Sequence, residues 1–233
     1  MKLDTSKVSI KTSLASCFGS NFQDLNGSQD FLDELATMAQ EITIEANSYI
    51  FKERDANNYV YIPISGVIML ERSTARGSRH VFAFLFTGNL IGLSEFSFYT
   101  FSAKSVSNST IVKINKDLIK NVFERHPQIA KRFHEYTNMV LNYILDQLFI
   151  MGQKTAHQRL ALFLLDMEKR IGHGTKKFFL PMSRQDIADY LGMSLETTSR
   201  GFTSLKNKGL ISIENNYSIT LLDPITLTEF SDN

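Results

Sequence analysis

The sequence has one cysteine, Cys17, and no tryptophan among its 233 residues. A single cysteine excludes an internal disulfide and a cysteine-rich zinc or iron–sulfur site, and it is typical of a reducing compartment. The longest apolar run without charge, Val81 to Ser94, has 14 residues and is too short to cross a bilayer. Because no apolar segment follows Met1, we expect no signal peptide. These absences predict a cytoplasmic protein without membrane association.

Catalytic and metal-binding motifs are also missing. The chain has no GxSxG elbow and no phosphate-binding loop, so we expect that it is not an enzyme. A metal site is not expected either, because no two histidines have the HxH, HxxxH or HExxH spacing. Two alternatives stay open, namely a haem ligand among the histidines and a redox or intermolecular-disulfide role for Cys17. The histidines are His80, His126, His134, His157 and His173.

Composition and charge indicate a globular chain with one region that favours anions. Hydrophobic residues make up 43% of the sequence and charged residues 21%, which is enough to build a core in one or two domains. The net charge of +1 is uninformative by itself. Residues 150–222, however, carry 10 basic and 6 acidic side chains. This excess points to the C-terminal part as the place where a polyanion would bind.

The first half of the chain predicts a short arm followed by strands. Residues 1–20 are rich in Ser, Thr and Lys and predict a mobile arm. A short amphipathic helix is expected over 31–39. Between 42 and 114, β-branched and aromatic residues alternate between turn signals, which is typical of an all-β sandwich or barrel. A run of aromatic residues could line an apolar effector pocket or form the core of these strands: Phe82, Phe84, Phe86, Phe96, Phe98, Tyr99 and Phe101.

The helical period begins after Asn115. A short helix over 116–124 is followed by a break at Pro127 and by a long helix over 129–151. Apolar residues recur along the long helix every three or four positions, which predicts a seam between two copies of the chain. The predicted interface residues are Ile129, Phe133, Tyr136, Val140, Ile144 and Met151.

The stretch from Met182 to Ile211 carries the functional signal. It predicts a helix capped by Ser183, a turn at Gly192 and a second helix capped by Ser194, followed by a β-hairpin. This is the plan of a winged helix-turn-helix, whose second helix reads DNA. Three residues near the start of that helix share one face by their spacing, and they are candidates for base contacts. They are Glu196, Ser199 and Arg200.

The order of these segments resembles the CRP/FNR superfamily of bacterial transcription regulators. The stretch SRQDIADYLGMSLETTSRGFTSLKNKGLI resembles the family's helix-turn-helix closely, and TAHQRLALFLL resembles the helix that opens its DNA-binding domain. The strand-rich segment resembles the family's β-roll, with glycines at its turns. The resemblance implies an α+β fold with four parts: an arm over 1–20, a cyclic-nucleotide-binding-like β-roll (jelly roll) over 21–118, a dimerisation helix over 119–152, and a winged helix-turn-helix over 153–233.

The resemblance also implies roles for residues of the motif. LETTSR carries the Glu-x-x-Ser-Arg pattern of the fumarate–nitrate branch, which implies that Glu196, Ser199 and Arg200 read a TTGAT-like half-site. It further implies phosphate contacts from Arg184, Ser194 and Thr197. The cyclic-AMP branch has another base-reading arginine where this chain has Leu195, which argues against that branch's half-site.

Departures from the family concern its effectors. Cyclic-AMP binders carry a Glu and an Arg where this chain has Leu93 and Phe101. Phe cannot pair with a phosphate, so cyclic AMP is not expected to bind. The iron–sulfur cluster of the oxygen-sensing branch needs four cysteines and is excluded by count. A small apolar effector stays open, as does control by abundance alone.

The sequence thus predicts a homodimeric DNA-binding transcription regulator that recognises a TTGAT-N4-ATCAA-like palindrome. The expected partners are double-stranded DNA, a second copy of the chain and RNA polymerase. The alternative is a β-roll interaction scaffold without a role at DNA, which the intact face of Glu196, Ser199 and Arg200 disfavours.

Overall fold

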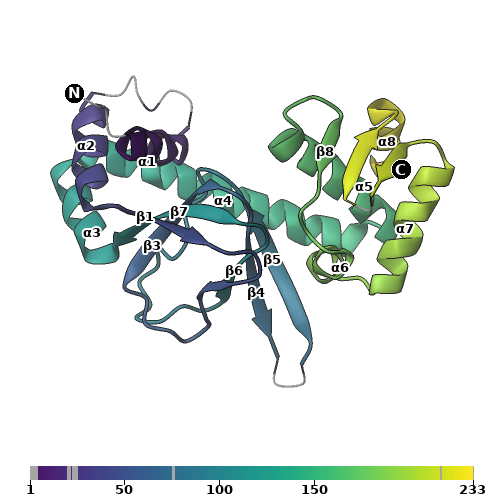
Figure 1. Ribbon diagram of the computed structural model, residues 1–233, viewed down its shortest axis with the longest axis horizontal. Coiled ribbons are helices and arrows are strands. Elements are labelled where there is room, and N and C mark those ends of the chain that lie inside the picture. Colours follow the sequence, from purple (N-terminus) through teal and green to yellow (C-terminus); the bar gives the residue numbers. More distant parts are fainter. Residues whose placement is uncertain (1–4, 20–21, 23–25, 75–76, 216, 233) are drawn as a thin grey trace. The chain divides into compact units, whose positions relative to one another are not determined.

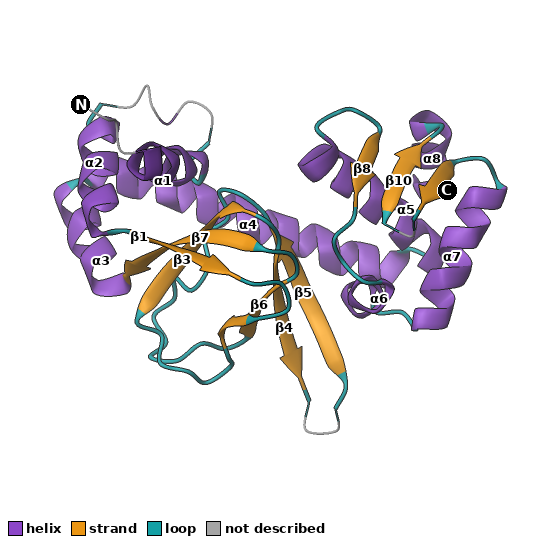
Figure 2. Cartoon of the chain, viewed as in Figure 1, coloured by secondary structure: helices purple, strands orange, loops and turns teal. Residues whose placement is uncertain are grey.

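The computed structural model describes residues 5–19, 22, 26–74, 77–215 and 217–232 (Figure 1). The chain divides into two compact units. The first comprises Met1–Arg72 and Phe82–Asn142, and the second comprises Ser73–Val81 and Tyr143–Asn233. Both units contain helices and strands (Figure 2). Within the described ranges, no helix is both long and apolar enough to cross a membrane.

The first unit contains the strand-rich segment that the sequence predicts. Its strands form two sheets, in which β7 pairs antiparallel with β1 and β3, and β6 pairs antiparallel with β2 and β4. The glycines that the resemblance placed at the turns, Gly66, Gly77, Gly88 and Gly92, all have positive φ. The strands are β1 (Gln40–Ile44), β2 (Tyr49–Phe51), β3 (Tyr59–Ser65), β4 (Ile68–Ser73), β5 (Arg79–Leu85), β6 (Ser102–Ser105) and β7 (Ser109–Asn115).

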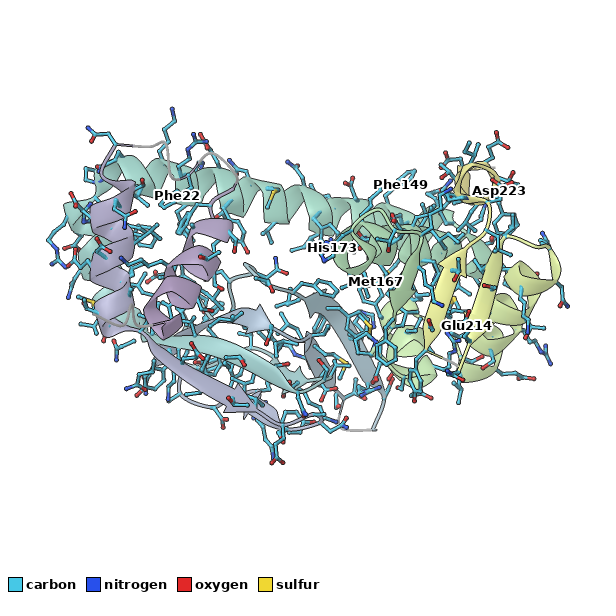
Figure 3. The ribbon with its side chains drawn as sticks, turned by 45° about the horizontal axis from the view of Figure 1, so that its top comes forward. Phe22, Phe149, Met167, His173, Glu214 and Asp223 are labelled. Atoms are coloured by element: carbon cyan, nitrogen blue, oxygen red, sulfur yellow. The ribbon has the colours of Figure 1, made fainter. Side chains whose placement is uncertain are left out.

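This unit also contains the helices α1 (Thr5–Ser16), α2 (Ser28–Met38) and α3 (Lys116–Arg125). The prediction of a mobile arm over 1–20 is therefore wrong, because most of this segment forms helix α1. Ile10, Leu14 and Cys17 are buried against the same core as Phe31 of α2. Their spacing of four and three residues places them on one face of a helix, a pattern that the abundance of Ser and Thr obscures. Figure 3 labels Phe22, which also belongs to this core.

The long helix α4 (Pro127–Gln153) has 27 residues and spans about 40 Å. It begins at the proline that the sequence marks as the break, where a missing N–H costs no hydrogen bond. Its first part belongs to the first unit and its last part to the second.

The second unit contains the helices and the hairpin of the predicted winged module. Strands β8, β10 and β9 form an antiparallel sheet in that order. Helix α8, which was not expected from the sequence, follows the hairpin and packs on α5. The elements are α5 (Ala156–Met167), a π-helical turn (Glu168–Gly172), β8 (Lys177–Phe179), α6 (Arg184–Leu191), α7 (Leu195–Asn207), β9 (Ile211–Glu214), β10 (Ser218–Leu221) and α8 (Pro224–Asp232).

Candidate nucleic-acid interface

Helix α6 is fixed at both ends by the residues that predicted it. Ser183 and Asp186 form a reciprocal cap, in which Ser183 Oγ accepts from the Asp186 N–H at 3.1 Å and Asp186 Oδ2 accepts from the Ser183 N–H at 3.0 Å. The helix ends at Gly192, which has φ +63°. A left-handed residue at this point is inexpensive only for glycine, so the chain can turn sharply into the next helix.

Helix α7 begins at Ser194, whose Oγ accepts a hydrogen bond from the Thr197 N–H at 3.0 Å. The hydroxyls of Ser194 and Thr197 lie 2.8 Å apart. Ser194 is exposed and Thr197 half-buried, so both hydroxyls lie at the surface where α7 starts. Thr198, in contrast, is buried and donates to the Ser194 carbonyl. Its side chain supports the turn and is not available to a ligand.

The two sides of α7 differ in character. Phe202 and Leu205 are buried, whereas Glu196, Ser199 and Arg200 are exposed. Arg200 Nη2 donates to Glu196 Oε1 at 2.6 Å, and both side chains are at least 70% exposed. The structure therefore brings together on one solvent-facing surface the three residues that the sequence singles out. They line a shallow groove with four more residues of the same helix and its end: Thr203, Ser204, Asn207 and Lys208.

A close crossing of two helices sets the position of α7. At Gly201, a Cβ atom would lie 2.8 Å from Cδ2 of Leu160 and 3.2 Å from Cδ2 of His157, both on α5. Leu160 is fully buried, so a shift of its side chain would disturb the core around it. The crossing therefore favours glycine at position 201.

Arg184, the first residue of α6, has a partner that sequence reasoning missed. Its guanidinium carbon lies 3.2 Å from the centre of the Phe202 ring. Burial lowers the pKa of Arg184 to about 10, so the side chain is still charged at neutral pH. This contact joins the two helices of the motif, because Phe202 lies on α7. No pattern in the sequence points to this pair, which is separated by 18 residues.

The predicted interface residues on α4 do not share one environment. Ile129 is fully buried in the core of the first unit. Phe133 lies 5.1 Å from Phe123, centre to centre, and Tyr136 Oη accepts from the Leu90 N–H at 3.1 Å. Val140 and Met151 are half-buried, and only Ile144 is strongly exposed, at 49%. The N-terminal members of the predicted seam thus pack against their own chain.

A different stripe of α4 is exposed. Leu141, Ile144, Leu145 and Leu148 are each between 49% and 62% exposed. At 100° per residue these four positions fall within about 100° of the helix circumference. Phe149, labelled in Figure 3, borders the stripe and is 62% exposed. Large apolar side chains at i, i+3, i+4 and i+7 are typical of a surface that packs against another helix.

The interior of the β-roll contains a cluster of buried residues that includes Phe51, Tyr61 and Tyr99. Aromatic rings fill it, with Phe51 stacked on Tyr99 at 3.6 Å and on Tyr61 at 5.6 Å between ring centres. Leu93 and Phe101 stand at the positions that the resemblance assigns to the charged anchors of cyclic-AMP binders. The Ser102 hydroxyl already accepts from the Glu53 N–H at 2.9 Å. The loop after Leu93 is held from inside by Lys116, whose Nζ donates to two loop carbonyls.

Comparison with known proteins agrees with this architecture. Residues 158–230 match the sequence model of the Crp-like helix-turn-helix domain, and residues 41–126 match that of the cyclic nucleotide-binding domain. The transcriptional activatory protein AadR of Rhodopseudomonas palustris is 31% identical over 82% of this chain and 81% of its own length. The nitrogen fixation regulation protein FixK of Bradyrhizobium diazoefficiens is 31% identical over 83% of this chain and 82% of its own.

A solved structure supports the same assignment. The structure of FixK2 from Bradyrhizobium japonicum is similar with a TM-score of 0.78 and 28% identity, over 82% of this chain and 96% of that chain. The fold and the exposed helix-turn-helix define a DNA-binding regulator with an N-terminal β-roll. The chain belongs to the CRP/FNR family of transcriptional regulators. The α+β fold class predicted from the sequence is confirmed by these matches.

Proposed function

We propose that this protein controls transcription as a homodimer that binds a TTGAT-N4-ATCAA-like palindrome. The observation that carries the proposal is the exposed pair of Glu196 and Arg200 at the start of α7, with Ser199 beside it. Arginine can donate two bonds to guanine in the major groove, and glutamate can accept from cytosine. The 2.6 Å bond between the two side chains directs the guanidinium toward Glu196 on the exposed face of the helix.

Phosphate contacts complete the half-site. Ser194 and Thr197 present hydroxyls at the N-terminus of α7, where backbone N–H groups also favour anions. Arg184 supplies the positive charge at the start of α6. These contacts position the motif on the duplex, and the base contacts give sequence preference.

The second copy docks on α4 in this proposal. The stripe of Leu141, Ile144, Leu145 and Leu148 is the surface that two copies would bury against each other. Each large apolar side chain contributes about 1.5–3 kcal/mol when it is fully buried. This stripe replaces the seam that the sequence predicts, except at Ile144, which belongs to both. Two recognition helices related by a twofold axis would match the symmetry of the palindrome.

The regulator works without cyclic AMP and without an iron–sulfur cluster. The aromatic filling of the β-roll and the absence of both charged anchors support the first statement, and the single cysteine supports the second. Its input is either another signal or its own abundance, and RNA polymerase is the partner through which it acts in the cytoplasm.

The test is a titration of the full-length protein on a TTGAT-N4-ATCAA duplex and on a scrambled duplex, read by fluorescence anisotropy. Arg200→Ala should weaken binding to the palindrome by about tenfold or more, because each half-site loses a bidentate contact worth about 1–3 kcal/mol. Binding to the scrambled duplex should change little. Lys206→Ala is the matched control, since it removes one exposed positive charge from the same helix outside the groove.

If the wild-type protein binds both duplexes equally, the proposed site is wrong and the scaffold alternative gains support. If Arg200→Ala leaves the ratio of the two affinities unchanged, Arg200 does not read a base.

A further inference from the structure

One side chain of the second unit connects the end of the long helix to the helix-turn-helix. Arg159 of α5 is half-buried and donates hydrogen bonds to three backbone carbonyls. Its Nη2 lies 2.6 Å from the oxygen of Met151 in the last turn of α4, and its Nε lies 3.0 Å from the oxygen of Lys154, the residue that follows the helix. Its Nη1 lies 3.1 Å from the oxygen of Leu191, the last residue of α6.

Two of these acceptors, the oxygens of Met151 and Leu191, share a physical property. The last carbonyls of a helix have no partner within the helix, and they carry the negative end of its dipole. A guanidinium offers five N–H donors in a rigid plane, so it can satisfy carbonyls from two helix ends at once. Arg159 is thus shared between the C-terminus of α4 and that of α6.

The turn of the motif approaches α4 closely at the same place. At Gly192, a Cβ would lie 2.9 Å from Cε of Met151 and 3.8 Å from Nη1 of Arg159. A second connection lies one to two turns back along α4, where it meets the residue next to Leu191 on α6. Tyr190 of α6 donates to Gln147 Oε1 at 3.1 Å, and its hydroxyl lies 3.0 Å from that of Tyr143. Tyr190 is buried, which raises the pKa of its hydroxyl and keeps it protonated.

We propose that Arg159 is a positioning residue that holds the helix-turn-helix rigidly on the end of α4 and thereby sets the half-site spacing that the dimer accepts. The inference rests on the proposed function, because it assumes that α4 joins the two copies. Residue 159 itself reads no base: it lies on α5 and its donors are engaged by carbonyls.

Spacing is the property that such a connection controls. Each added base pair moves a half-site by about 3.4 Å along the duplex and rotates it by about 35°. A recognition helix fixed to the dimer helix fits one spacing better than its neighbours. If the connection is loose, the helix can follow the half-site, so neighbouring spacings bind nearly as well. Affinity for a single half-site does not depend on the connection.

The experiment measures full-length protein on duplexes with three, four and five base pairs between the TTGAT and ATCAA half-sites, and on a duplex with one half-site. The wild type should bind one spacing about tenfold more tightly than its neighbours. Arg159→Ala should reduce this preference to less than about threefold, while affinity for the single half-site stays within about twofold of the wild type. Arg132→Ala is the control, because Arg132 pairs with Glu135 on the same turn of α4 and should keep the wild-type preference.

Arg159→Lys keeps the charge but loses the planar set of donors, so it should also lose most of the spacing preference. If Arg159→Ala fails to fold, the spacing preference of Arg159→Lys tests the inference in its place. A folded Arg159 variant that keeps the wild-type preference would overturn the inference, and so would an equal loss of affinity on all duplexes, the single half-site included. In both cases the proposed function would stand, since the wild type would still prefer the palindrome. A wild type that does not prefer the palindrome over a scrambled duplex would overturn both.

Discussion

The guanidinium of Arg184 stacks on the ring of Phe202, with its central carbon 3.2 Å from the ring centre. A flat guanidinium can stack in this way and still direct N–H groups outward, whereas an ammonium cannot do both. We therefore predict that Arg184→Lys resembles Arg184→Ala and is not conservative. Both variants should weaken binding to consensus and scrambled duplexes together and lower the slope of log affinity against log salt by about one per half-site.

Titrations at two salt concentrations measure this slope. Phe202→Leu provides a second variant, in which the arginine is kept but the ring is removed. If the slope falls in Arg184→Ala but not in Arg184→Lys, the charge alone matters and the stacking contributes nothing.

Dimerisation should depend on the exposed stripe of α4. Leu145→Asp and Leu148→Asp should each yield folded monomers, because a carboxylate would have to be buried in an apolar interface. Met139→Asp is the matched control: Met139 is 60% exposed on the same helix but lies roughly opposite the stripe at 100° per residue. Sedimentation velocity measures the mass, and circular dichroism measures the helix content. A dimeric Leu145→Asp, Leu148→Asp double variant would contradict the assignment.

Phe133 should behave differently from the residues of the stripe. It packs against Phe123 within its own chain, so Phe133→Asp should lower the melting temperature of the first unit. A monomeric Phe133→Asp variant with an unchanged melting temperature would favour the seam that the sequence predicts.

Cys17 should be chemically inert in the folded protein. It is 2% exposed, and burial raises the pKa of its thiol to about 12. The reactive thiolate is therefore scarce at pH 8, and it becomes abundant only as the pH approaches that value or when the chain unfolds. Alkylation by iodoacetamide at pH 8 should be slow without denaturant and fast in its presence, as mass spectrometry can follow. Rapid labelling of the folded protein, or loss of DNA binding after mild oxidation, would reopen a redox role.

Cyclic AMP should have no effect on DNA binding. Neither Leu93 nor Phe101 can pair with its phosphate or its ribose hydroxyl, and aromatic rings occupy the interior of the β-roll. Isothermal titration with millimolar nucleotide should give only heat of dilution, while the palindromic duplex gives a saturable signal in the same instrument. Saturable heat at micromolar nucleotide would show that the β-roll binds cyclic AMP without charged side chains at positions 93 and 101.

The helix-turn-helix could be predicted from the sequence because its signals are local. Ser183, Ser194 and Gly192 fix the ends of two short helices by their own chemistry, and the spacing of Glu196 and Arg200 then places them on one face. The contact of Arg184 with Phe202 and the three acceptors of Arg159 depend on how helices cross. Periodicity contains no information on such crossings.

The long helix shows where a periodic pattern becomes ambiguous. Helix α4 has two apolar sides, one formed by Ile129, Phe133 and Tyr136 and the other by Leu141, Leu145 and Leu148. Both have spacings of three and four residues, so both fit a heptad-like seam. Only the tertiary structure distinguishes them, because the first side is covered by the chain's own core and hydrogen bonds.

The missing side chain at Gly201 has a consequence for how this regulator could change its target. Leu160 and His157 touch the back of α7 at that position, while the side chains at 196, 199 and 200 point to solvent. Substitutions on the outer surface can alter the preferred base without disturbing the support behind it. A methyl group at 201 would instead press on Leu160 and His157, and a shift of α7 that relieved this contact would move the outward side chains together. The packed side of α7 therefore sets the position of the helix, whereas its exposed side can change by substitution.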